Sequence, residues 1–162
     1  MNRKITWLAI AAIGLGCSLS SLAEDKIEWY PGCFEVEGTT QKTTTVTVVP
    51  EAAGLTRFTV AFQDAKSNSG FAQFPLRTSG DFPAFEFTGQ AAKDGVAEVW
   101  VEGDHGWRFQ QKIHFRAGPQ QTFTVELRET TSAKSQWMRV IFTNKENPTG
   151  NTVMLGAPKF VK

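Results

Sequence analysis

Apolar and polar residues alternate with a period of two along most of the chain. In one segment, Phe123, Val125 and Leu127 are separated by threonine and glutamate. Successive side chains of a β-strand point to opposite faces of its sheet, so the pattern indicates strands with one buried face. Eight segments show it: residues 43–49, 57–62, 85–87, 96–101, 107–115, 122–128, 137–142 and 152–161. No long segment after residue 23 has the apolar spacing of an amphipathic helix, and the sequence therefore predicts an all-β protein.

Turn residues such as Asp94-Gly95 and Gly118-Pro119 separate the predicted strands. Strands of a parallel sheet are apolar on both faces, and the alternation therefore favours antiparallel pairing. Eight short strands with regular turns predict an antiparallel β-sandwich with jelly-roll topology. Residues 64–81, rich in serine, glycine and asparagine, are expected to form a long surface loop.

The first 23 residues resemble a secretory signal peptide. Arg3 and Lys4 precede an apolar run over residues 5–15, and small residues follow up to Ala23. Cleavage after Ala23 would leave a single β-sandwich domain, residues 24–162, in the periplasm or the medium of a bacterial cell. An alternative is a lipoprotein signal at Cys17, which would anchor the protein in a membrane without changing its fold.

Composition excludes several classes of function. Residues 24–162 carry 15 basic and 16 acidic residues, which gives no electrostatic case for binding nucleic acid or an anionic membrane. Cys33 is the only cysteine after residue 23, so no internal disulfide forms, and we expect a buried thiol. No metal-ligand cluster, phosphate loop or nucleophile elbow is present. We therefore expect no catalytic residue, no metal site and no cofactor.

Two short segments, residues 112–114 and 125–129, are similar to motifs of jelly-roll alginate lyases. They occur in the reverse order, however, and the tyrosine-rich C-terminal motif of those enzymes is absent. Tyr30 is the only tyrosine, so the usual proton donor of that reaction has no candidate. The alginate lyase interpretation is therefore rejected.

Four tryptophans follow residue 23: Trp29, Trp100, Trp107 and Trp137. Trp100 and Trp137 alternate with the apolar core residues of their own strands, which predicts that both indoles face outward. In residues 107–115 we expect Phe109 to face the core together with Ile113 and Phe115, with Gln111 as a polar exception. Exposed large aromatics are uncommon without a use, although a loop or a partner could cover them.

A jelly roll would place the outward side chains of several strands on one sheet. Its order puts strand 137–142 between strands 57–62 and 96–101, with strand 107–115 on the far side. An indole packs on the apolar face of a pyranose, and charged or amide groups bind its hydroxyls. The predicted ligand-binding residues are Trp100, Trp137, Arg139, Glu98, His114, Lys112, Gln110 and Arg57.

The last third of the chain resembles galactose-binding-like carbohydrate-binding modules, which occur attached to bacterial polysaccharide hydrolases. The resemblance lies in residues 115–118, 122–127, 136–142 and 151–160. It implies a β-sandwich that binds carbohydrate. Gly156-Ala157 stand where many of those modules have an Asp-Asn pair, so neither a structural calcium nor a family binding residue is carried over.

These observations predict a non-catalytic protein that binds an oligosaccharide or a polysaccharide. The alternative is a structural protein of the cell envelope that meets a protein partner through the same sheet, because tryptophan and arginine are also enriched at interface hot spots. A small hydrolase or lyase is a third alternative, for which the chain lacks a recognisable acid–base pair.

Overall fold

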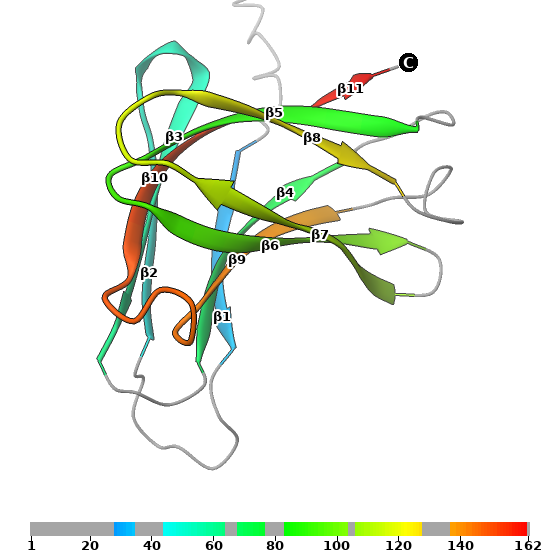
Figure 1. Cartoon of the computed structure of the whole chain (residues 1–162). Helices are drawn as coiled ribbons and strands as arrows, with labels where there is room; N and C mark the ends of the chain where they lie inside the picture. The colour runs from blue at the N-terminus through cyan, green and yellow to red at the C-terminus, as the bar shows by residue number, and fades with distance from the viewer. Residues whose placement is uncertain are drawn as a thin grey trace, which may run out of the picture.

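A computed structural model describes residues 28–34, 44–63, 68–76, 83–103, 106–127 and 137–161 (Figure 1). Its strands are β1 (Tyr30–Phe34), β2 (Thr44–Pro50), β3 (Leu55–Phe62), β4 (Ser69–Pro75), β5 (Ala84–Ala91), β6 (Gly95–Gly103), β7 (Gly106–Phe115), β8 (Gln121–Glu126), β9 (Trp137–Thr143), β10 (Asn151–Gly156) and β11 (Lys159–Val161). A short 3-10 turn, Ala52–Gly54, connects β2 to β3. The predicted signal peptide and Cys17 lie outside the described residues. Within these residues, no helix is long and apolar enough to cross a bilayer.

The strands form two antiparallel sheets packed face to face. The five-stranded sheet has the order β1-β4-β9-β6-β7, and the six-stranded sheet has the order β11-β5-β10-β3-β2, with β8 also paired to β5. Figure 1 shows the two layers, with the blue strand β1 in the five-stranded sheet and the red strand β11 in the six-stranded sheet. The predicted antiparallel β-sandwich with jelly-roll topology is confirmed.

The jelly-roll order holds with one strand exchanged relative to the sequence-based prediction. The sequence pattern predicts that residues 57–62 lie beside residues 137–142, but the structure places β4 there. Strand β3 pairs instead with β2 and β10 in the six-stranded sheet. The expected loop over residues 64–81 therefore contains a strand. Phe71 and Phe74 of β4 lie on opposite faces and both are buried, so the strand lacks the alternation that marked the others.

Aromatic rings fill much of the space between the sheets. Phe142 of the five-stranded sheet contacts Phe58 at 5.7 Å between ring centroids and stacks on Phe115 at 5.6 Å. All three side chains are buried, as are Val99 and Val140 on the inner faces of β6 and β9. Burial of such side chains stabilises the sandwich by about 1.5–3 kcal/mol for each large apolar residue.

A β-bulge alters the orientation of β7. The pairing of β6 with β7 shifts between Val99 and Trp100, so Val99 is opposite Gln111 whereas Trp100 is opposite Phe109. Gln110 is the extra residue and is 1% exposed. Phe109 consequently faces outward and is 44% exposed, and its predicted place in the core is wrong. Beyond a bulge, every side chain of the strand points to the face opposite to the one that a strict two-residue period predicts.

The bulge makes a testable distinction between two phenylalanines. Phe142→Ala should lower the free energy of unfolding by about 3–5 kcal/mol, because it leaves a cavity in the core. Phe109→Ala should cost less than about 1 kcal/mol, because the ring is already in contact with water. Urea denaturation followed by circular dichroism measures both. Equal losses for the two variants would contradict the outward placement of Phe109.

Candidate functional site

The outer face of the five-stranded sheet carries most of the exposed aromatic side chains of the described residues. Strand pairing sets Phe109, Trp100, Arg139 and Gln73 side by side, one from each of β7, β6, β9 and β4. The next row toward the β6–β7 turn contains Trp107, Glu102 and Trp137. Side chains two residues apart on a strand share a face, so both rows lie on the same surface. We call this surface the aromatic face.

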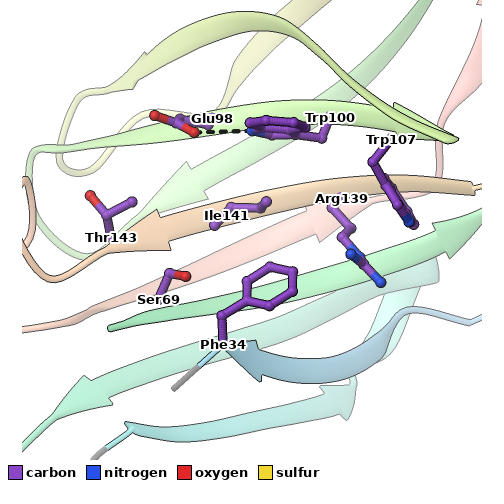
Figure 2. A pocket seen from close by; sticks show the side chains of 8 residues that line it. All are labelled: Phe34, Ser69, Glu98, Trp100, Trp107, Arg139, Ile141 and Thr143. Carbon is purple, nitrogen blue, oxygen red and sulfur yellow. Dashed lines mark hydrogen bonds between the residues drawn. The ribbon is translucent and has the colours of Figure 1, made fainter. Parts of the chain in front are cut away.

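A pocket of about 310 Å³ opens on the aromatic face. It is lined by Phe34, Ser69, Glu98, Trp100, Trp107, Arg139, Ile141 and Thr143 (Figure 2). The lining residues come from β1, β4, β9, β6 and β7, so every strand of the sheet contributes. The pocket thus depends on the whole sheet and not on a single loop.

Arg139 lies at the centre of an aromatic cluster. Its guanidinium carbon is 3.7 Å from the ring centroid of Trp107 and 4.3 Å from that of Phe71, with Phe34 at 5.3 Å. Cation–π attraction at such distances contributes about 0.5–2 kcal/mol for each ring. Arg139 Nε donates a hydrogen bond to Gln73 Oε1 at 3.1 Å, which fixes the plane of the guanidinium. Burial lowers the pKa of Arg139, and the nearby Glu102 carboxylate acts in the opposite direction.

Phe71 is held against Arg139 by the strands beside it. It is paired with Gly32 of β1, and its ring lies where a Cβ atom of residue 32 would be. The Phe34 ring packs against it with centroids 4.9 Å apart. A glycine is therefore required at position 32 to leave room for the Phe71 ring beside the guanidinium.

Trp100 is fixed by a hydrogen bond within its own strand. Its indole Nε1 donates to Glu98 Oε2 at 3.0 Å, and Phe109 meets the ring edge-on at 5.9 Å between centroids. Figure 2 shows Glu98 and Trp100 along β6, with Glu98 at the end of the pocket away from Arg139. Because the two contacts restrict the indole, it offers a preorganised apolar surface to a ligand.

A more polar side pocket of about 260 Å³ adjoins the first and shares Ser69, Glu98 and Thr143 with it. Lys112 lies here and forms an ion pair with Glu146. The hydrogen bond to Glu146 raises the pKa of Lys112. Together the two pockets make a groove that is aromatic at one end and charged at the other.

The structure brings together only part of the predicted site. Trp100, Arg139 and Glu98 line the pocket, and Lys112 lines the side pocket. Trp137 lies on the aromatic face but outside both pockets, and its ring contacts Tyr30 at 5.9 Å. His114 is exposed on β7 opposite Val96, also outside both pockets.

Three residues do not lie where the sequence pattern predicts them. Gln110 was expected on the outer face, but the bulge turns it inward, where its Nε2 donates to the Arg108 carbonyl. Arg57 was expected beside β9, but β3 belongs to the six-stranded sheet, and Arg57 pairs there with Glu51 at 2.6 Å. Cys33, expected to be buried, is exposed because β1 lies at the edge of its sheet.

Sequence reasoning missed Trp107, Phe71 and Phe34. Trp107 was hidden by the bulge, and Phe71 and Phe34 lie on strands that the alternation did not reveal. One signal was present, because Gln111 interrupted an otherwise apolar series in its strand. A polar residue on a core parity is consistent with an interruption of regular strand pairing, which a bulge produces.

Other parts of the described structure are weaker candidates for a ligand site. A larger hollow of about 560 Å³ lies at the six-stranded sheet, but no tryptophan is among its lining residues. No group of three or more histidine, cysteine or carboxylate side chains that could hold a metal ion occurs among the described residues. The pocket on the aromatic face is therefore the candidate site.

Comparison with known proteins supplies the context for this site. No family model and no curated protein matches the sequence. Among solved structures, the family 11 carbohydrate-binding module of the cellulosomal cellulase Lic26A-Cel5E of Clostridium thermocellum superimposes with a TM-score of 0.57 at 8% identity, over 86% of this chain and 90% of that chain. The chain shares the β-sandwich fold of carbohydrate-binding modules. The likeness thus extends well beyond the last third of the chain, in which the sequence suggested it.

Two further structures are similar. The family 11 module of Clostridium thermocellum in complex with a β-1,3-1,4-mixed-linked tetrasaccharide has a TM-score of 0.56 at 8% identity, over 86% of this chain and 91% of that chain. A carbohydrate-binding module of family 29 has a TM-score of 0.46 at 10% identity, over 83% of this chain and 77% of that chain.

The contact between Gly32 and Phe71 can be tested directly. Gly32→Ala should displace the Phe71 ring and lower the free energy of unfolding by about 1–3 kcal/mol, as overpacking does. The neighbouring exchange Cys33→Ala is the matched control and should leave stability within about 0.5 kcal/mol, because Cys33 is exposed. Urea denaturation compares the two variants. A Gly32→Ala protein as stable as Cys33→Ala would show that the ring does not rest on the glycine.

Proposed function

We propose that this protein binds a carbohydrate chain in the groove of the aromatic face and does not catalyse its cleavage. The observation that carries the proposal is the pocket in which Trp100 and Trp107 lie with Arg139. The fold shared with carbohydrate-binding modules supports the same function.

The chemistry of the pocket suits a sugar ring. A pyranose has an apolar face of C–H groups that packs on an indole, and its hydroxyls need hydrogen-bonding partners at the edge of the ring. Trp100 supplies the apolar surface. Glu98 Oε1, which has no hydrogen bond within the described residues, and the hydroxyls of Ser69 and Thr143 supply polar contacts.

The pocket also supports binding without catalysis. Glycoside hydrolysis commonly uses two carboxyl groups on either side of the scissile bond. Among the described residues, Glu98 is the only carboxylate that lines the main pocket, where it accepts the Trp100 indole hydrogen bond, and Glu146 of the side pocket is ion-paired with Lys112. Carboxylates held by such partners suit recognition of hydroxyl groups better than acid–base chemistry.

Export forms part of the proposal. The leader-like residues 1–23 would direct the protein to the periplasm or the medium, where polysaccharides are accessible. A lipid at Cys17 would instead hold the same domain at a membrane surface.

Substitution of the indoles tests the proposed function. Trp100→Ala and Trp107→Ala should each weaken binding to the recognised polysaccharide about 10-fold or more, because each removes an apolar surface from the pocket. Trp137→Ala should have a smaller effect, since that ring lies outside the pocket. Affinity electrophoresis against a panel of neutral and acidic polysaccharides, followed by calorimetry, gives the values.

Arg57→Ala is the matched control for these variants. Arg57 is half-exposed on the opposite sheet, so its loss should leave affinity unchanged. Full affinity in both Trp100→Ala and Trp107→Ala would show that the polysaccharide does not bind to the aromatic face. A panel in which no polysaccharide retards the wild-type protein would overturn the proposed function itself.

The second candidate is a protein partner on the same face. Tyr30, Phe34 and Phe109 are 45%, 47% and 44% exposed, and exposed aromatic clusters also occur at protein interfaces. Size-exclusion chromatography with light scattering, before and after addition of an oligosaccharide that binds, separates the two. A protein partner predicts a complex that forms without sugar and that a competing oligosaccharide dissociates, whereas a protein that binds only carbohydrate elutes as the same species before and after the sugar is added.

A further inference from the structure

The guanidinium of Arg139 is enclosed in a way that restricts what it can bind. Trp107 and Phe71 cover it at 3.7 and 4.3 Å. Rings that lie over a planar cation leave its N–H donors directed sideways, within the plane. Nε is already bonded to Gln73, whereas the two terminal nitrogens have no hydrogen bond within the described residues.

The charge of Arg139 is also uncompensated within the part of the chain that the structure describes. No described carboxylate lies within ion-pair distance of its nitrogens, whereas Arg57 and Lys112 each have a glutamate partner. Glu102 influences Arg139 only through space, and partial burial already lowers the pKa of the guanidinium. A partly desolvated cation gains more from a charged acceptor than a fully solvated one does.

The two charged ends of the pocket differ. Glu98 lies at the end away from Arg139, with the Trp100 indole between them (Figure 2). Glu98 accepts the indole hydrogen bond at 3.0 Å and lies opposite Lys112 in the neighbouring strand. A sugar ring on Trp100 would thus have a hydroxyl acceptor on one side and a planar cation on the other.

From this arrangement we propose that the carbohydrate recognised is acidic, with a carboxylate or a sulfate ester on the sugar ring that binds the terminal nitrogens of Arg139. The inference rests on the proposed function and specifies its ligand class. A guanidinium matches the two oxygens of a carboxylate or a sulfate with paired hydrogen bonds, and such charge-assisted pairs are about twice as strong as neutral ones.

The first experiment needs no variant. Calorimetry compares the wild-type protein on polygalacturonate, on the same polymer after its carboxyl groups are reduced to alcohols, and on mixed-linked β-glucan. Sulfated galactan forms a further arm and distinguishes a sulfate from a carboxylate. We expect the acidic polymer to bind about 10- to 100-fold more tightly than its reduced form, as loss of a hydrogen bond to a charged group implies.

Two substitutions of Arg139 locate the effect. Arg139→Gln should lose most of the preference for the acidic polymer, whereas Arg139→Lys keeps the charge and should lose only the paired geometry, about 3- to 10-fold. Arg57→Gln is the matched control, because it removes a cation from the opposite sheet, outside the groove, and should leave the preference intact. Urea denaturation of each variant shows whether the domain still folds.

The outcomes separate the two proposals. Equal binding of the acidic and the reduced polymer would overturn the acidic ligand while leaving carbohydrate binding in place. A preference that survives in Arg139→Gln, or that is lost equally in Arg57→Gln, would overturn the role of Arg139. Binding to none of the polymers would overturn the proposed function and this inference together.

Discussion

The pairing of β6 with β9 is the interaction on which the rest of the structure depends. It places Val99 opposite Val140 on the inner side and Trp100 opposite Arg139 on the outer side. A single set of backbone hydrogen bonds therefore fixes both the core and the candidate site. Because side chains alternate along a strand, a shift of one residue would bury the arginine and expose the valines. The hydrophobic core thus enforces the register that aligns the pocket.

The bulge in β7 adds a second aromatic group to this alignment. Without it, Phe109 would continue the inward series of Ile113 and Phe115. With it, Phe109 packs against Trp100 in a T-shaped contact, and Trp107 covers Arg139. Bulges often occur where a sheet re-aims a side chain near a functional site, and this one converts a core-like sequence into part of the aromatic face.

Arg139 connects the two halves of the aromatic face. Trp107 comes from β7, whereas Phe71 and Phe34 come from β4 and β1 on the other side of β9. The guanidinium contacts all three rings, so groups far apart in the sequence depend on one side chain. The arrangement keeps the cation rigid, and a rigid binding group loses little conformational entropy when a ligand arrives.

The sequence alone determined the fold class and part of the site. Strict alternation in residues 96–101 and 137–142 was enough to turn Trp100 and Arg139 outward, because the two-residue period is a property of any extended chain. Only the tertiary structure decided which strands became neighbours. It placed β4 instead of β3 beside β9, and it reversed Phe109 and Gln110 through the bulge. Strand β4 is buried on both faces and so carries no alternation, and a bulge is set by packing between strands, which no single strand's pattern records.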